Sequence, residues 1–418
     1  MSAAAPAAVS NGPFFDVDAI RRDFPILSRT VHGKPLVYLD NAASAQKPQA
    51  VIDAETQSYA DVYANVHRGA HFLSGAATDA FEAARVRIAR FINAAEDAEI
   101  IFTRGATEAI NLVAQSWGRA FLAEGDEIIV SELEHHANIV PWQMLRAEKG
   151  VVLKVAPIHD DGSLDLDAFE ALVGPRTRLI AISGMSNALG TILPIQRVIA
   201  AAKAVGARTL IDACQLVVHT PVDVQALDCD FLVFSAHKLY GPSGVGALYA
   251  KRDLLEAMPP WQGGGEMIAT VTFEETIWAD VPHKFEAGTP AIAQAPAFAA
   301  AIDYVETLGM DAISAHETAV GRMAEDRLRA IPGLRLFGGA DERGAVLSFA
   351  VDGAHPHDVA VLIDRQGVAV RSGHHCAQPL MARLGLVGTA RASFALYNTA
   401  DEVEALGVAV EKAIRMLG

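Results

Sequence analysis

The fold is decided by the stretch RTLIDACQLVVHTPVDVQALDCDFLVFSAHK, residues 208–238. It contains two short apolar runs, RTLID (208–212) and DFLVFS (230–235), which have the length and hydrophobicity of buried strands. Similar runs occur earlier, separated by longer helical patterns: EIIFT (99–103), DEIIVSEL (126–133) and TRLIAIS (177–183). Strands that alternate with helices are joined by right-handed crossovers, so the pattern predicts an α/β fold built on a mainly parallel sheet.

The pattern changes after about residue 300. Amphipathic helices there surround one alternating run, AVLSFAV (345–351), which predicts a second α+β domain. Thr399 and Glu402 fit a capping box at the start of a final helix. Apolar residues recur along that helix at helical spacing and predict that it packs on the core: Val403, Leu406, Val410, Ile414 and Leu417.

Composition and charge exclude several classes of protein. The 418 residues are 51% hydrophobic and 20% charged, which is typical of a globular chain of two or three domains. The formal net charge of −16 argues against a nucleic-acid-binding surface, which needs clustered Lys and Arg. An uncharged stretch, 287–302, contains Pro290 and Pro296 and is shorter than the ~20 residues that cross a bilayer, and we expect no membrane segment.

The N-terminus and the cysteines indicate a cytoplasmic protein. The opening MSAAAPAAVSNGP (1–13) lacks the basic flank of a secretory signal and is predicted to be a disordered tail. The three cysteines, Cys214, Cys229 and Cys376, form no CxxC pair and are odd in number. This argues against a disulfide framework and for a reducing compartment.

Polar residues directly after the predicted strands are the first candidate site residues, because parallel sheets bind ligands beyond the carboxyl ends of their strands. In TRGATEAIN, Gly105 and Ala106 lead from a strand into a helix that opens at Thr107. The exposed N–H groups and the dipole at such a helix start suit a phosphate. Taken alone, the segment is more typical of an ordinary strand-to-helix turn.

Two further strand ends carry an acid and an amine. Asp212 ends an apolar run, where a buried carboxylate needs a cationic or hydrogen-bonding partner. Lys238 lies between two apolar segments, shortly after Ser235 and His237. Together with Thr107 these residues suit pyridoxal 5′-phosphate (PLP), because Lys238 can form the Schiff base, Asp212 can keep the pyridine nitrogen protonated and the helix start can hold the phosphate.

Histidine-containing segments carry further candidates. In SELEHHANIVPW, His135 and His136 follow a strand, and His135 could stack on a flat ligand or move protons. In RSGHHCAQPL (371–380), Cys376 lies among basic groups that favour the reactive thiolate. A zinc site is the alternative there, but no spaced Cys/His set completes a tetrahedron. Arg391, in RASFALYN, could clamp a carboxylate through two parallel hydrogen bonds.

The chain resembles the group II, SUF-system type of cysteine desulfurase, a fold-type I PLP enzyme of the class V aminotransferase family. The resemblance runs from about residue 23 to the C-terminus, and the short RSGHHC segment indicates group II. Its markers occur in unbroken order: YLDNAASAQKP, NVHRGAH, RGATEAIN, EHHANIVPWQ, SAHKLYGPSG, GGGEMIAT, FEAGTP and RSGHHCAQPL.

The resemblance implies a domain organisation. The large PLP-binding domain (37–305) would have a mainly parallel seven-stranded sheet. The smaller α+β C-terminal domain (306–418) would carry the Cys376 loop, and an N-terminal segment (14–36) would pack with it. The protein would form a homodimer.

The resemblance also implies roles for individual residues. Lys238, Cys376 and His135 would be catalytic, with Cys376 as the sulfur acceptor and His135 stacked on the cofactor ring. Thr289 would reach the cofactor phosphate from the neighbouring subunit. The other cofactor contacts would come from Ala106, Thr107, Asp212, Gln215, Ser235 and His237, and the substrate would be held by Asn187, Arg371, Arg391 and His67.

The implied reaction converts L-cysteine to L-alanine and leaves a persulfide on Cys376. A sulfur-acceptor protein of the SufE or SufU type would then take the sulfur for iron–sulfur cluster assembly. Selenocysteine lyase activity on L-selenocysteine is the closest alternative, and an aminotransferase-like PLP enzyme or a metal-binding scaffold are remoter ones. No metal is expected in the site.

Five positions depart from the usual motifs of this group. The chain reads DACQ, SAHK and WQGGGEM where DGAQ, SGHK and WEGGGSM are common. Packing near the cofactor is altered by Ala213, Cys214 and Ala236. A hairpin expected at the dimer interface is altered by Gln262 and Glu266.

Overall fold

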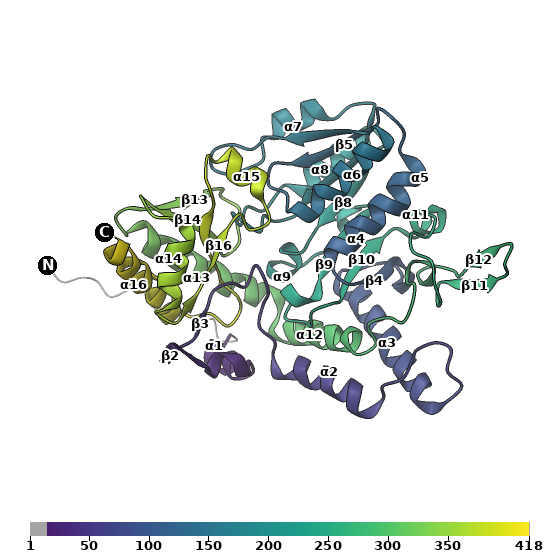
Figure 1. Cartoon of the computed structure of the whole chain (residues 1–418), viewed down its shortest axis with the longest axis horizontal. Helices are drawn as coiled ribbons and strands as arrows, with labels where there is room; N and C mark the ends of the chain where they lie inside the picture. Colours follow the sequence, from purple (N-terminus) through teal and green to yellow (C-terminus); the bar gives the residue numbers. More distant parts are fainter. Residues whose placement is uncertain (1–14, 418) are drawn as a thin grey trace.

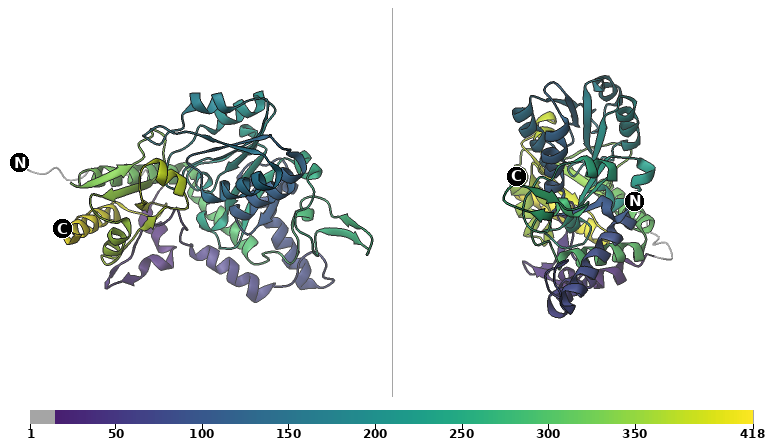
Figure 2. Two further views of the ribbon diagram at one scale, coloured as in Figure 1. Left: turned by 45° about the horizontal axis from the view of Figure 1, so that its top comes forward. Right: turned by 90° about the vertical axis from the view of Figure 1, so that its right-hand side faces the viewer.

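The computed structural model describes residues 15–417, so the predicted tail (1–13) lies outside the described residues. Figure 1 shows a large sheet covered by helices, with the C-terminal elements gathered at one end of the molecule. The two further views in Figure 2 show the N-terminal segment lying beside these C-terminal elements. Within residues 15–417, no helix is long and apolar enough to cross a membrane.

The large sheet has seven strands, and the predicted mainly parallel arrangement is confirmed. All neighbouring strands run parallel except β10, which is antiparallel to both of its neighbours. In spatial order the strands are β4 (Ile100–Thr103), β10 (Gly246–Ala250), β9 (Phe231–Ser235), β8 (Arg208–Asp212), β7 (Thr177–Ser183), β5 (Glu127–Ser131) and β6 (Val152–Ala156).

Five of these strands coincide with the apolar runs of the sequence, and the two others were not predicted. Strand β6 lies at the sheet edge and is partly exposed, so its residues do not form a continuous apolar run. Strand β10 begins at Gly246, where an added Cβ atom would come within 2.6 Å of the Gly105 Cα. Glycine therefore permits β10 to pack against the strand-to-helix turn after β4.

Helices cover both faces of the sheet, which explains why its strands are apolar on both sides. Along β9, Leu232 and Phe234 pack into one core with Phe81, whereas Phe231 and Val233 pack into the other. The helices of the large part are α2 (Gln49–Asp61), α3 (Phe72–Phe91), α4 (Ala106–Val113), α5 (Arg119–Phe121), α6 (Val140–Lys149), α7 (Leu166–Leu172), α8 (Ile195–Ala204), α9 (Leu216–His219), α10 (Val224–Leu227), α11 (Arg252–Ala257) and α12 (Gln294–Leu308).

The C-terminal part contains an antiparallel sheet and three long helices, as the change of pattern predicts. The sheet has the order β13 (Leu334–Phe337), β14 (Val346–Val351), β17 (Thr389–Ser393) and β16 (Arg371–Gly373). The helices are α13 (Met310–Arg329), α14 (Pro356–Asp364) and α16 (Ala400–Leu417), with the short α15 (Gln378–Arg383) between β16 and β17.

The final helix begins with the predicted capping box. The Thr399 N–H donates to Glu402 Oε2 at 3.1 Å, and the Glu402 N–H donates to Thr399 Oγ1 at 3.3 Å. Val403, Leu406 and Val410 are buried in the C-terminal core. The prediction was wrong for Leu417, which is 42% exposed because it lies in the last turn of the helix.

The N-terminal segment contacts the C-terminal part. In α1 (Val17–Arg22), Arg21 forms a 2.9 Å ion pair with Glu402. Strand β3 (Val37–Tyr38) pairs in parallel with β15 (Val368–Ala369), and β1 (Thr30–Val31) forms a short hairpin with β2 (Lys34–Pro35). A second hairpin, β11 (Ile268–Val271) with β12 (Thr276–Trp278), projects from the opposite end of the molecule in Figure 1.

Candidate active site

A pocket of about 220 Å³ opens at the carboxyl ends of β8 and β9, which end at Asp212 and Ser235. This is the edge at which parallel sheets bind ligands. The pocket also receives side chains from the C-terminal part of the chain. Its lining consists of Ala42, Ala43, Ala106, Thr107, His135, Ala137, Asn187, Asp212, Cys214, Ser235, His237, Lys238, Arg371, His375, Cys376 and Arg391.

One end of the pocket is formed by the start of α4. The Ala106 N–H donates to Ser235 Oγ at 2.9 Å, so this helix start is joined directly to the end of β9. Gly105 precedes the helix with a φ of +149°, and a Cβ atom on it would lie 3.2 Å from Ser235 Oγ. Thr107 follows in the first turn, where free N–H groups and the helix dipole favour an anion.

The middle of the pocket contains an amine, a carboxylate and a neutral imidazole. Lys238 ends the short turn after β9, and Asp212, only 6% exposed, accepts the Cys214 N–H at 3.0 Å. Burial, and then the charge of Lys238, lower the pKa of His135 to about 4. The His135 Nδ1 accepts the Ala137 N–H at 3.1 Å, so the neutral ring carries its proton on Nε2.

The far side of the pocket is built around Arg391, which is 1% exposed on β17. Its Nη2 donates to Asp40 Oδ1 at 2.9 Å, and its Nη1 donates to the Asn187 carbonyl at 2.8 Å. Its buried Nε has no hydrogen-bond partner among residues 15–417. Because a buried donor is costly without an acceptor, this Nε suits a ligand oxygen.

Cys376 enters the pocket from the loop between β16 and α15. The preceding His375 is 3% exposed, and its Nε2 lies 2.8 Å from Thr389 Oγ1. The Asn187 Nδ2 donates to the His375 carbonyl at 2.7 Å. The two other cysteines, Cys214 and Cys229, are buried, and burial raises the pKa of both thiols to about 12.

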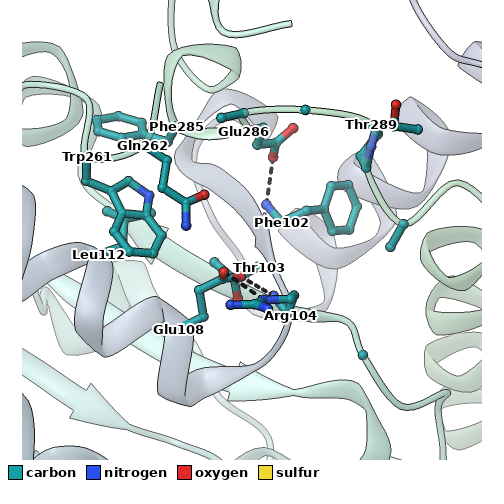
Figure 3. A pocket seen from close by; sticks show the side chains of 15 residues that line it. Phe102, Thr103, Arg104, Glu108, Leu112, Trp261, Gln262, Phe285, Glu286 and Thr289 are labelled. Carbon is teal, nitrogen blue, oxygen red and sulfur yellow. Dashed lines mark hydrogen bonds and ion pairs between the residues drawn. The ribbon is translucent and has the colours of Figure 1, made fainter. Parts of the chain in front are cut away.

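The pocket brings together most of the predicted site residues, and three lie outside it. Gln215 is buried beside it, and its Nε2 donates to the Ala42 carbonyl at 2.8 Å. His67 lies 2.8 Å from Glu82 through its Nε2. Thr289 lines a separate pocket of about 330 Å³ with Glu286 and Phe102, shown in Figure 3. The roles predicted for Gln215, His67 and Thr289 stay predictions.

Two pocket features were not identified from the sequence. Asp40 supports Arg391, and His375 lines the wall. Asp40 belongs to the motif YLDNAASAQKP, and His375 to RSGHHCAQPL, so both motifs contained the signal. The contact between Asp40 and Arg391 joins residues 351 positions apart, which no local pattern indicates.

Comparisons with known proteins show the family of the chain. The family model described as aminotransferase class-V matches residues 37–406. A cysteine desulfurase of Dickeya dadantii is 52% identical over 405 residues, covering 97% of this chain and 98% of its own. A probable cysteine desulfurase of Mycolicibacterium paratuberculosis is 52% identical over 95% of this chain, which spans 58% of that relative's length.

A solved structure shows the same fold. The crystal structure of the cysteine desulfurase CsdA from Escherichia coli matches with a TM-score of 0.90 and 42% identity, covering 97% of this chain and 100% of that one. The chain therefore belongs to the class-V aminotransferase family and, within that family, to the cysteine desulfurases. Its fold is that of the fold-type I PLP enzymes, and PLP is the family's cofactor.

The residues of the pocket fit PLP. The start of α4 and Ser235 offer donors for the phosphate, and burial lowers the pKa of the neighbouring His237 to about 4, so its ring is neutral. Lys238 supplies the amine and Asp212 the carboxylate that this cofactor requires. Arg391 lines the same pocket, and its guanidinium suits the carboxylate of an amino-acid substrate.

Proposed function

We propose that the protein is a PLP-dependent cysteine desulfurase, a sulfurtransferase that converts L-cysteine to L-alanine and receives the sulfur on Cys376. The observation that carries this proposal is that Lys238 and Cys376, from opposite parts of the chain, line one pocket. The names of the relatives support the same activity. An aminotransferase needs no thiol opposite its lysine.

PLP held at Lys238 supplies an electron sink for the bond changes at the substrate. Asp212 would keep the ring nitrogen of the bound cofactor protonated and would so maintain that electron sink. The fork of Arg391 binds the substrate carboxylate, with Asn187 alongside, and this contact orients the Cα–H toward Lys238. The Lys238 amine accepts the α-proton as a general base and later returns it to carbon. Arg371, also in the pocket wall, adds positive charge beside the reacting groups.

Cys376 carries out the sulfur transfer. Its thiolate attacks the substrate sulfur, forming an S–S bond while the substrate C–S bond breaks. The electrons of the broken bond stay with the substrate carbon, which takes up a proton to become the methyl group of alanine. One L-cysteine and one thiol thus give one L-alanine and one persulfide, with no external oxidant or reductant.

The wider setting is also a proposal. The persulfide would pass to a sulfur-acceptor protein of the SufE or SufU type for iron–sulfur cluster assembly, and the enzyme would act as a cytoplasmic homodimer. The short RSGHHC segment supports the SUF-system type, whereas the Escherichia coli structure is of a CsdA. The relatives are named for cysteine, which favours L-cysteine over L-selenocysteine.

Alanine formation from L-cysteine by three purified proteins tests this function. With a dithiol reductant present to reduce the persulfide, wild type and Cys229→Ala are expected to produce alanine and sulfide, because Cys229 lies in the core away from the pocket. Cys376→Ala is expected to keep the yellow cofactor and to lose at least about 100-fold in turnover, since the nucleophile is absent. Lys238→Ala is expected to lose the absorbance of the lysine-bound cofactor. Normal turnover by Cys376→Ala would contradict the proposed function.

A further inference from the structure

The backbone at Cys376 has an unusual conformation. His375 and Cys376 have φ angles of +53° and +56°, so two consecutive residues with side chains adopt the left-handed region. Residues other than glycine rarely do so, and they persist there only when surrounding contacts enforce it. The position of the Cys376 thiol therefore depends on whatever holds this loop.

On the N-terminal side of Cys376 the loop is held through His375, whose carbonyl and imidazole are hydrogen-bonded to Asn187 and Thr389. On the C-terminal side, His136 makes two contacts. Its backbone N–H donates to the Cys376 carbonyl at 2.7 Å, and its Nε2 accepts the N–H of Gln378 at 2.9 Å. His136 thus contacts the loop at the cysteine itself and two residues beyond it.

The bond to Gln378 also replaces a helix cap. Gln378 is the first residue of α15, and the N-cap residue, Ala377, supplies no side-chain hydrogen bond. The first N–H groups of a helix have no partner within the helix and need an acceptor from elsewhere. The imidazole of His136, which lies 242 positions away in the sequence, is that acceptor for Gln378.

His136 is itself held by the large part of the chain. It begins a short turn (His136–Asn138) after β5, and Asn138 in this turn is fully buried. The Asn138 Nδ2 donates to Glu134 at 2.8 Å, and its Oδ1 accepts the Trp142 Nε1–H at 3.0 Å. The turn is therefore anchored to α6 and the core, and it can transmit that rigidity to the Cys376 loop.

The imidazole is suited to accept a hydrogen bond. Burial, and then the charge of His374, lower the pKa of His136 below its ordinary value. The ring is consequently neutral at neutral pH and keeps a lone pair on Nε2, which a protonated ring would lack.

We propose that His136 is a positioning residue for the nucleophile, which fixes the Cys376 loop to the large part of the chain so that the thiol faces Lys238. This inference rests on the proposed function of Cys376. His136 acts through the loop backbone, while the neighbouring His135 faces the cofactor pocket.

Two variants of His136 test this role in the holoenzyme. His136→Ala removes the acceptor of the Gln378 N–H, whereas His136→Gln offers an amide oxygen in its place. For His136→Ala we expect kcat to fall about tenfold or more with KM changed less than about twofold, because the nucleophile is misplaced but substrate binding is intact. Alkylation of Cys376 by iodoacetamide should become faster, and hydrogen exchange at the Gln378 amide should increase.

His136→Gln is expected to restore all three measurements to within about threefold of wild type. The positioning role would be overturned if His136→Ala had the kcat, the alkylation rate and the hydrogen-exchange rate of wild type. It would also be overturned if His136→Gln were as impaired as His136→Ala in all three measurements. Hydrogen exchange and alkylation do not need turnover, so they remain informative if His136→Ala is less stable. Cys376→Ala in the same assay separates the positioning role of His136 from the proposed function. Normal turnover by Cys376→Ala would refute the proposed function itself, and not only the role of His136.

Discussion

Arg391 donates a 2.9 Å hydrogen bond from its Nη2 to Oδ1 of Asp40, a residue 351 positions earlier in the chain. The pair joins β17 of the C-terminal sheet to the segment that follows β3. It orients the guanidinium so that its unpartnered Nε is left for a ligand. A contact between distant parts of the chain therefore fixes the guanidinium to which we assign the substrate carboxylate.

Replacement of Arg391 by lysine is expected to weaken substrate binding. Lysine keeps the positive charge but loses the planar fork that holds a carboxylate and Asp40 together. We expect the KM for L-cysteine to rise about 10- to 100-fold, because one or two charge-assisted hydrogen bonds are lost. Steady-state kinetics at saturating PLP measure this. Asp40→Asn is the control and should give a smaller rise, and an unchanged KM in Arg391→Lys would refute the carboxylate role.

Replacement of Gly105 by alanine is expected to weaken PLP binding. The added Cβ would lie 3.2 Å from Ser235 Oγ, the acceptor of the Ala106 N–H, and would disturb the donors at the start of α4. We expect the affinity of the apoenzyme for PLP to fall about tenfold. Gly125→Ala is the matched control, because Gly125 also has a positive φ (+82°) but no atom lies within 4 Å of its added Cβ. Equal affinities in the two variants would show that the Ser235 contact is unimportant.

Glu134 is expected to make stability depend on pH. Burial raises its pKa from 4.5 to about 7, although Ser131, Asn138 and Ser183 hydrogen-bond to it. At pH values between these two pKa values, the folded state binds more protons than the unfolded state. The free energy of unfolding therefore falls as the pH rises.

Glu134→Gln should remove this contribution, because an amide does not titrate in this range. Wild type should lose on the order of 2 kcal/mol more than the variant between pH 5 and pH 7. Urea unfolding at the two pH values gives the comparison. Parallel pH dependence in the two proteins would mean that Glu134 is ionised throughout.

Much of the fold could be predicted because apolar strand runs are a local signal. Strands β5, β7, β8 and β9 are buried and read as continuous apolar stretches. Strand β6 is partly exposed, and Lys154 within it forms a 2.7 Å ion pair with Glu127 on β5. A charged residue that is paired across the sheet interrupts the apolar pattern, so the sequence alone did not indicate this strand.

The site was predictable where topology dictates it. Thr107, Asp212 and Lys238 follow strands whose carboxyl ends meet at one edge of the sheet, and they line the same pocket. The contacts of Arg391 and His136 could not be predicted, because each joins segments more than 200 residues apart. His67 and Thr289 lie outside the pocket of the single chain, and the role predicted for Thr289 requires a neighbouring subunit.

The central claim is that Cys376 accepts the sulfur of a substrate processed at Lys238, and a single-turnover experiment tests it most directly. Holoenzyme is mixed with less than one equivalent of L-cysteine in the absence of reductant. The protein is then alkylated and digested, and the masses of its peptides are measured by mass spectrometry. The account predicts one alanine released per extra sulfur atom, with that atom on the peptide containing Cys376. Alanine release with the extra sulfur on Cys214, on Cys229 or on no cysteine would contradict it.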